Sequence, residues 1–505
     1  MTQLETRPEQ AIAPLPEDLT AQRLLSRAQA AALAVLASCA VVIAAVWLAT
    51  GAGPSPLWWA QAAVATVTVI YILVIGFKTV LILAAGGASI VRFGPGDGHQ
   101  VPDDEMPGYT VLVPLYREER VLPDLVRRLA RLDYPAGALQ VLLLVEADDE
   151  DTRRALGALS LGPQFEVVLI PPGQPRTKPK ACNVGLVRAR GEFCVIFDAE
   201  DRPEPGQLRK AVAAFGSQPP WVVCVQAELQ YWNPGTNVLT RWFAAEYALN
   251  FSLFLRGLDR FRLAIPLGGT SNHFRTAALR DLGGWDPHNV TEDADLGIRI
   301  ARRGWSVRMM DSVTEEEANS HPGNWLRQRS RWVKGYYQTW LVHMRSPWRL
   351  WRDLGTRRFL GLQATLGGAT LTLLLNPVFW ALTCVYLVAG PGPIAALFPM
   401  PVLYLGVIAM LAGNFLMIYM LMMGCMERGL FRAVPAMLVV PLYWAMMSVA
   451  AYKALGQLLI PGRRHYWELT RHGLVADAAS APEAAPAPEG QPAYADVTGP
   501  APTTT

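Results

Sequence analysis

Hydrophobic residues form long uninterrupted runs near both ends of the chain and short runs in its middle. No charged residue occurs from Ala30 to Thr50, and a second apolar run extends from Trp58 to Gly76 after a Gly/Pro-rich turn. Each run has about the 20 residues needed to cross a bilayer. A mostly polar segment precedes the first run and no cleavage pattern follows it, so a cleaved signal peptide is not indicated. The pattern predicts two transmembrane helices within residues 30–86, after an N-terminal segment at 1–29.

The middle of the chain, residues 95–345, alternates short apolar strands with amphipathic stretches. Apolar positions at 124–132 have helical spacing between the first two strands. Strands that are apolar along most of their length and alternate with helices are typical of a parallel sheet covered on both faces. The pattern therefore predicts one α/β domain. Its expected strands are residues 109–116, 140–147, 166–172, 192–199 and 221–229.

The apolar pattern returns in the last third and predicts interfacial and transmembrane helices over 346–474. The first of three candidate segments is broken by Asn376-Pro377, and the third holds Lys453. Both are longer than one simple crossing, so we expect one of them to include an interfacial or re-entrant helix, and the sequence leaves open which. The Ala/Pro/Thr-rich tail at 475–505 has no Lys or Arg and is expected to be disordered. The three candidate segments are residues 359–389, 401–424 and 433–460.

Composition agrees with a membrane protein that has a large water-soluble part. Hydrophobic residues make up 51% of the chain and charged residues 17%, whereas soluble domains carry about 25% charged residues. Subtracting 42 acidic from 45 basic side chains leaves a net charge of +3, which excludes a strongly basic protein that coats nucleic acid. The six cysteines are scattered without a C-x-x-C pair, so neither a disulfide framework nor a zinc site is indicated.

Arginines predict the orientation in the membrane. They crowd the central domain and its exit, whereas the loop at 390–400 contains no Lys or Arg. Because basic segments tend to stay in the cytoplasm, we expect the central domain, the segment 1–29 and the basic stretch 461–473 on that side. Three plain crossings after the domain would place 461–473 outside, which is the reason for expecting one interfacial or re-entrant helix.

Two groups of carboxylates directly follow apolar strands, where substrates bind in open α/β sheets. The first contains Glu146, Asp148 and Asp149, for which a solvated acidic loop is the alternative interpretation. The second contains Asp198 and Glu200, whose i, i+2 spacing at a strand end lets both reach one divalent cation. Oxygen ligands with open positions for phosphate oxygens suit Mg²⁺ or Mn²⁺. Since D-x-E tripeptides are common, the position after a strand carries this prediction.

Two further groups lie later in the domain. Glu292 and Asp293 precede a stretch with helical spacing, where one carboxylate would suffice as an N-cap and another could be the general base for a hydroxyl. Arg331 and Trp332 could supply a cation for a phosphate leaving group and a flat face for a sugar. A membrane-surface helix or a positive-inside anchor is the alternative for that segment. A basic loop containing Lys180 could hold a diphosphate or balance nearby acids.

The order of these motifs, flanked by apolar helices, resembles the membrane-embedded family 2 glycosyltransferases, which include the cellulose, hyaluronan and related β-glycan synthases. The resemblance covers residues 30–475 and implies a GT-A-type α/β cytoplasmic domain inserted between transmembrane α-helices. The sequence has no G-x-x-x-x-G-K-[ST] and no strand-linked G-x-G-x-x-G, which disfavours an ATP-driven pump and a dinucleotide oxidoreductase.

The resemblance also implies a role for each candidate residue. Asp293 would be the general base, and Glu292 and Trp332 would bind the acceptor. Asp198 and Glu200 would hold the metal. The nucleotide-sugar would be bound by Glu146, Asp148, Asp149, Lys180, Asp198, Gln328 and Arg331.

Some features depart from the family pattern. Glu200 stands where the second aspartate of D-x-D is usual, so the metal could use Asp201 instead, or both. The first acidic group reads E-A-D-D rather than D-D. No β-barrel regulatory module follows the last apolar segment, so control by cyclic-di-GMP is not expected by that route. The stretch His465–Gly473 sits where related synthases have a gating loop.

The implied function is inverting, metal-dependent transfer from a nucleotide sugar, a UDP-sugar, to a growing β-glycan, processive and with export across a bacterial inner membrane. Partners would be the donor, the glycan acceptor, membrane lipid and export or periplasmic accessory subunits, with no nucleic acid. The alternative is a non-processive transferase that acts on a lipid-linked acceptor. A transporter or receptor with a nucleotide-binding domain is an alternative from another class.

Overall fold

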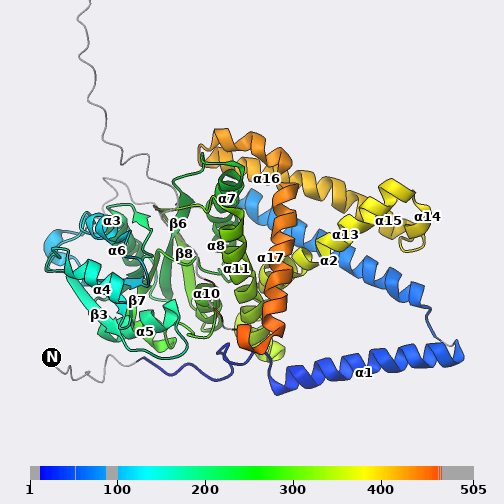
Figure 1. Ribbon diagram of the computed structural model, residues 1–505, viewed down its shortest axis with the longest axis horizontal. Coiled ribbons are helices and arrows are strands. Elements are labelled where there is room, and N and C mark those ends of the chain that lie inside the picture. The colour runs from blue at the N-terminus through cyan, green and yellow to red at the C-terminus, as the bar shows by residue number, and fades with distance from the viewer. Residues whose placement is uncertain (1–11, 52, 87–100, 465, 467, 469–505) are drawn as a thin grey trace, which may run out of the picture.

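The computed structural model shows an α/β domain from one side of which long helices extend (Figure 1). The predicted disordered tail at 475–505 and most of the predicted gating stretch lie outside the described residues. The described residues are 12–51, 53–86, 101–464, 466 and 468.

The domain is built on an eight-stranded mixed sheet in the order β3-β2-β1-β4-β7-β6-β8-β5. β1, β2, β3 and β4 are mutually parallel and β8 is parallel to β6, whereas β7 runs antiparallel to β4 and β6, and β5 runs antiparallel to β8. The expected all-parallel sheet is therefore wrong at β5 and β7, which are too short to give a recognisable apolar pattern. The five expected strands are confirmed as β1, β2, β3, β4 and β6. The strands are β1 (Tyr109–Leu115), β2 (Leu139–Glu146), β3 (Phe165–Ile170), β4 (Phe193–Ile196), β5 (Arg202–Pro203), β6 (Val222–Tyr231), β7 (Asn272–Arg275) and β8 (Ser306–Glu316).

Helices cover both faces of the sheet, as the apolar strands predict. On β1, Val111 enters a core with α3, α4 and α6, whereas the next residue, Leu112, enters a core with α5, α9 and α10. The second core continues into the long helices through Leu81 and Met420. The domain and the apolar helices therefore share one packed interior. These helices are α3 (Leu122–Leu129), α4 (Glu150–Gly157), α5 (Lys178–Arg188), α6 (Gln207–Ser217), α9 (Thr276–Asp281) and α10 (Glu292–Arg302), and a short turn η2 (Asp103–Glu105) precedes β1.

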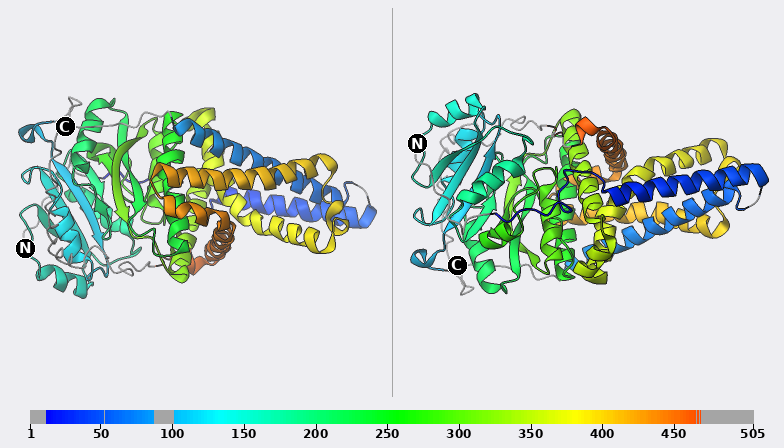
Figure 2. Two further views of the ribbon diagram at one scale, coloured as in Figure 1. Left: turned by 90° about the horizontal axis from the view of Figure 1, so that it is seen from above. Right: turned by 90° about the horizontal axis from the view of Figure 1, so that it is seen from below.

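Four helices among the described residues are long and apolar enough to cross a membrane: Arg27–Thr50, Pro56–Ala85, Pro347–Ala389 and Met400–Glu427. They extend away from the sheet (Figures 1 and 2), and α1 (Arg27–Thr50) stands apart from the other three in Figure 1. The expected break at Asn376-Pro377 is wrong, since the helix continues through Pro377, as membrane helices tolerate. The elements are α1 (Arg27–Thr50), α2 (Pro56–Ala85), α12 (Pro347–Leu362), η4 (Gln363–Gly368), α13 (Ala369–Ala389), α14 (Gly392–Ala395), α15 (Met400–Ile408), η5 (Ala409–Gly413) and α16 (Asn414–Glu427).

The last apolar segment has a different direction. It consists of η6 (Phe431–Val439) and α17 (Pro441–Leu459), which are bent by 69° relative to each other. In Figure 1 α17 crosses the direction of α2 and α13 and follows α11 (Pro322–His343), and in Figure 2 it is seen nearly end-on. The bend agrees with the expected interfacial or re-entrant helix, whose place in the membrane stays a prediction. The remaining elements, at the junction, are α7 (Val238–Leu249), η3 (Asn250–Phe254), α8 (Leu255–Arg260) and η7 (Pro461–Arg463).

Gly335 has no side chain, and α11 can therefore lie directly against the start of α10. A Cβ atom there would come 2.3 Å from Oγ1 of Thr291, and both residues are buried. We therefore expect Gly335→Ala to destabilise the protein by about 1–3 kcal/mol, because an overpacked interface must move apart. Thermal unfolding of protein in nanodiscs measures this.

Gly323→Ala is the matched control, because Gly323 lies in the same helix with no atom within 4 Å of its virtual Cβ. It should leave the unfolding temperature unchanged or slightly raised. Equal unfolding temperatures for the two variants would contradict the close approach of α10 and α11.

Candidate active site

A cavity of about 1720 Å³ begins at the carboxyl ends of β2, β4 and β8 and continues between the membrane-type helices. It brings together most of the residues that the sequence motifs single out. Asp148, Asp149 and Lys180 do not line it. The predicted residues that do are Glu146, Asp198, Glu200, Glu292, Asp293, Gln328, Arg331 and Trp332.

A lysine that the motifs did not assign sits among the carboxylates. Lys178, at the first turn of α5, pairs with Asp198 at 2.5 Å between Nζ and Oδ1, and its Nζ donates a hydrogen bond to the backbone oxygen of Gly269 at 2.8 Å. Burial lowers the pKa of Lys178, but the charges of Asp198 and Glu292 outweigh burial and the net shift is upward. The lysine therefore stays protonated and lies next to the predicted metal ligand.

The carboxylates around Asp198 suit a divalent cation. Among the described residues no group of three or more His, Cys, Asp or Glu side chains is arranged as a complete metal site. Asp198 and Glu200 line the cavity, and behind them the buried Asp201 has one oxygen, Oδ1, without a hydrogen-bond partner in the described structure. Burial and the charges of Asp198 and Glu200 raise the pKa of Asp201. Two hard oxygen donors with open positions fit Mg²⁺ or Mn²⁺ whose remaining ligands are phosphate oxygens.

A second pair of carboxylates lies at the start of α10. Asp293 faces the cavity, and its Oδ1 accepts a hydrogen bond from the backbone N–H of Ala294 at 2.7 Å. Burial raises the pKa of Asp293 to about 6, and burial together with the charge of Asp293 raises the pKa of Glu292 to about 8. A pKa raised above the usual carboxylate range suits a general base that works near neutral pH.

Helix α11 presents the Q-x-x-R-W residues to the same cavity. Arg331 is buried, which lowers its pKa, while the carboxylates of Glu292, Asp198 and Asp293 oppose that effect. Gln328 accepts a hydrogen bond from the Asn319 amide at 2.8 Å. These contacts bring a cation from α11 close to both acidic groups.

The three carboxylates of the first acidic group have different surroundings. Glu146 lines the cavity, and its buried Oε2 has no hydrogen-bond partner among the described residues. Asp148 pairs with Arg176, and Asp149 caps α4 by accepting a hydrogen bond from the N–H of Thr152 at 3.3 Å. Glu146 therefore offers an unpaired oxygen at the cavity wall, whereas the carboxylate of Asp149 is bonded to the backbone of α4.

Lys180 folds onto its own loop. Its Nζ donates to the backbone oxygens of Pro171 at 2.8 Å and Gly173 at 3.0 Å. The cavity is lined instead by Arg176 and Lys178 of the same basic run, and by Glu316 at the end of β8. The run Arg176-Thr-Lys178-Pro-Lys180 indicated a basic loop, but its spacing did not indicate which lysine faces the carboxylates.

Comparison with known proteins agrees with the predicted class of enzyme. Residues 107–335 match the family described as "Glycosyltransferase like family 2". The chain is 29% identical over 270 residues to a β-monoglucosyldiacylglycerol synthase from Synechocystis sp., which covers 53% of this chain and 54% of that protein. It is 26% identical over 245 residues to probable glucomannan 4-β-mannosyltransferase 7 from Oryza sativa subsp. japonica, covering 46% and 41%. The segment 107–335 is thus similar to family 2 glycosyltransferases, the enzyme class that the motifs predicted.

The chain spans about half the length of the curated relatives it matches. Among solved structures, it is similar to the mannosyltransferase PcManGT from Pyrobaculum calidifontis in complex with GDP-Man and Mn²⁺. The sequence identity is 21%, the TM-score is 0.48, and the alignment covers 79% of this chain and 99% of that one.

Proposed function

We propose that this chain transfers a sugar from a nucleotide sugar, a UDP-sugar, to an acceptor hydroxyl with inversion at the anomeric carbon, and that its domain has the GT-A architecture. The observation that carries the proposal is one cavity that contains Asp198, Asp293 and Arg331, which lie far apart in the sequence. A nucleotide-binding module alone would need neither the buried carboxylate of Asp293 nor the cation of Arg331.

In this mechanism each side chain acts on one part of the reaction. Asp293 removes the proton from the acceptor hydroxyl as that oxygen attacks the anomeric carbon. Arg331 and Lys178 stabilise the negative charge that develops on the diphosphate leaving group, as preorganised charges do in a buried site. Asp198 and Glu200 would hold Mg²⁺ or Mn²⁺, which would supply further positive charge next to the diphosphate. Trp332 orients the acceptor.

For the acceptor, we propose a growing β-glycan that leaves through the cavity, with successive additions before release. The cavity follows α13 from Thr365 on η4 to Tyr386 near its end. A helix of this length spans about 30 Å, which is the thickness of a hydrocarbon core. Asn376 and Asn414 face the cavity at this depth, and polar residues inside a membrane commonly mark a substrate path.

A lipid-linked acceptor that receives one sugar is the second candidate. Much of the cavity wall on α13, α15 and α17 is apolar, with Leu373, Leu403 and Met447 among its residues. Such a wall also suits acyl chains. For either acceptor we propose a location in a bacterial inner membrane with the catalytic domain in the cytoplasm, and export or periplasmic accessory subunits would belong to the glycan case.

The test is a donor screen followed by analysis of product length. Purified protein in nanodiscs is incubated with UDP-glucose, UDP-N-acetylglucosamine or GDP-mannose and with Mg²⁺, Mn²⁺ or EDTA. We expect metal-dependent release of UDP from one donor and a β-linked polymer. A single labelled sugar on lipid would favour the second candidate. If no donor is turned over, the transferase proposal fails and a binding or transport role takes its place.

A further inference from the structure

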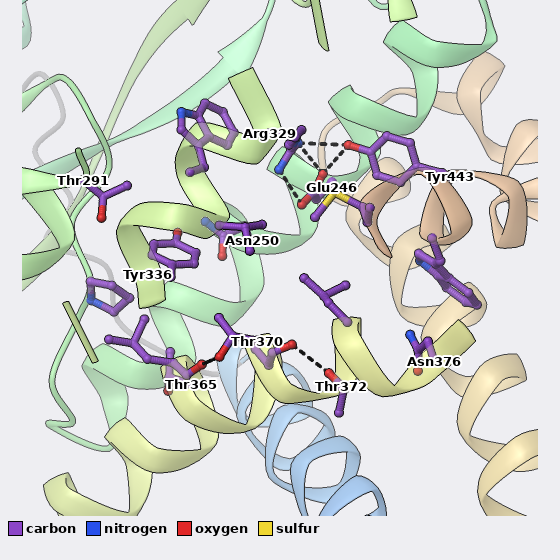
Figure 3. A pocket seen from close by; sticks show the side chains of 18 of the residues that line it. Glu246, Asn250, Thr291, Arg329, Tyr336, Thr365, Thr370, Thr372, Asn376 and Tyr443 are labelled. Atoms are coloured by element: carbon purple, nitrogen blue, oxygen red, sulfur yellow. Dashed lines mark hydrogen bonds and ion pairs between the residues drawn. The ribbon is translucent and has the colours of Figure 1, made fainter. Parts of the chain in front are cut away.

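Three side chains that no sequence motif assigned meet in the cavity wall where the α/β domain joins the membrane-type helices. They are Glu246 on α7, Arg329 on α11 and Tyr443 on α17, and they are called the collar below (Figure 3). All three line the same cavity as Asp293. The collar is therefore placed where an acceptor would pass between the membrane and the catalytic carboxylates.

Hydrogen bonds hold the carboxylate of the collar in one orientation. Arg329 donates from Nη1 to Oε1 of Glu246 at 2.9 Å and from Nη2 to Oε2, and the Tyr443 hydroxyl donates to Oε2 at 2.5 Å. Arg329 Nη2 also donates to the Tyr443 oxygen at 2.9 Å. A carboxylate offers about four acceptor positions, so Glu246 retains capacity to accept a further hydrogen bond.

Exposure shows which end of the ion pair faces the cavity. The side chain of Glu246 is 31% exposed, whereas that of Arg329 is 5% exposed. The carboxylate of Glu246 thus faces the open space, and the guanidinium of Arg329 lies behind it. The Nε atom of Arg329 has no hydrogen-bond partner among the described residues. Its Nη1 and Nη2 atoms make the hydrogen bonds to Glu246 and Tyr443.

The same guanidinium fixes the aromatic ring of Trp332. It lies 4.6 Å from the centroid of the Trp332 ring and 4.3 Å from that of Phe243. Tyr247 packs at 6.1 Å from Trp332 with an interplanar angle of 29°. Arg329 and Tyr247 therefore both pack against the Trp332 ring, and Arg329 links that ring to the carboxylate of Glu246. Sugars are bound by this combination, since an aromatic ring contacts C–H groups and an ionised carboxylate accepts bonds from hydroxyls.

We propose that the collar and Trp332 form a binding subsite for a sugar unit of the acceptor, either in a free glycan or in the headgroup of a glycolipid. Glu246 accepts a hydrogen bond from a sugar hydroxyl, and Arg329 and Tyr443 are positioning residues. The proposal rests on the function proposed above. An ion pair that only braces α7, α11 and α17 would affect stability and not sugar binding.

The experiment measures sugar binding directly, without turnover. Cellotriose is titrated by calorimetry into full-length protein in phosphatidylcholine nanodiscs, and native mass spectrometry counts bound glucosyl-dioleoylglycerol in a second arm. Tyr443→Phe keeps the Arg329–Glu246 pair and is expected to weaken binding about threefold to tenfold through the lost orientation of the carboxylate. Glu246→Gln should weaken it about tenfold or more, because a charge-assisted bond is lost.

Tyr452→Phe is the matched control on the same helix. Its hydroxyl donates to the backbone oxygen of Leu374 at 2.7 Å, and it does not line the cavity. Binding should match the wild type, and the unfolding temperature of each variant is recorded alongside.

Weaker binding of cellotriose or of the glycolipid in both collar variants, at an unchanged unfolding temperature, supports the subsite, and the probe that responds identifies the source of the sugar. Unchanged binding of both probes overturns it, as does a wild type that binds neither. A lower unfolding temperature with unchanged binding also overturns it in favour of a brace. A wild type that binds a probe but releases no nucleotide from any donor contradicts the proposed function and leaves the subsite supported.

Discussion

Asp293→Asn is expected to lower the rate of sugar transfer by about 10²–10⁴-fold while donor binding persists, because general-base catalysis contributes a factor of that size. The substitution keeps the size of the side chain and removes its ability to accept the proton. It also removes one of the charges that raise the pKa of Glu292. The measurements are UDP release from the donor found in the screen and calorimetric titration of UDP.

Asp281→Asn provides the control for this result. Asp281 ends α9 on the surface and does not line the cavity, so its amide should leave both rate and UDP affinity unchanged. A normal transfer rate in Asp293→Asn would show that another group takes the proton. Loss of UDP binding would instead show that Asp293 acts mainly on the donor.

Asp198→Asn is expected to cause the second largest loss, about 10²–10³-fold in metal-supported turnover, because charge stabilisation of the leaving group depends on this carboxylate. The amide is a poorer cation ligand, and Lys178 loses the partner that it has at 2.5 Å. We therefore expect the Mn²⁺ concentration for half-maximal turnover to rise as well. Titration of Mn²⁺ against UDP release measures both effects.

Asp311→Asn is the corresponding control, since Asp311 is an exposed residue of β8 outside the cavity. It should retain the wild-type response to Mn²⁺. An Asp198→Asn variant with the wild-type Mn²⁺ response would contradict the proposed metal position. Unfolding temperatures distinguish the loss of a metal ligand from a loss of fold caused by the unpaired Lys178.

Local pattern was sufficient for five of the eight strands and for the apolar helices, and it singled out most of the predicted residues that line the cavity. The apolar runs of β1 and β2 predicted strands within one residue at each end, since a strand buried on both faces needs apolar side chains throughout. The carboxylates of Asp198 and Asp293 were found because each follows an element boundary that the sequence marks. What the pattern could not supply was the pairing of short strands such as β7 (Asn272–Arg275), whose partners lie far away in sequence.

The choice between neighbouring residues of one motif depended on helix geometry. Lys178 and Lys180 are two positions apart in α5, so they leave the helix in different directions. Only Lys178 faces Asp198, and Lys180 bonds to backbone oxygens. Likewise Arg329 and Arg331 stand two apart in α11 and lie near different carboxylates. Arg329 binds Glu246, whereas Arg331 lies among the acids of the donor site.

The sequence by itself determined that the chain has apolar helices on both sides of an α/β domain, and that acidic groups follow particular strands and open particular helices, because hydrophobic period and residue chemistry are local properties. Only the tertiary structure decided that α17 crosses the other apolar helices, that Lys178 accompanies Asp198, and that Glu246, Arg329 and Tyr443 meet in one wall. These contacts join segments that are separated by many residues in the sequence. They depend on how the faces of helices and strands pack together, which no single segment determines.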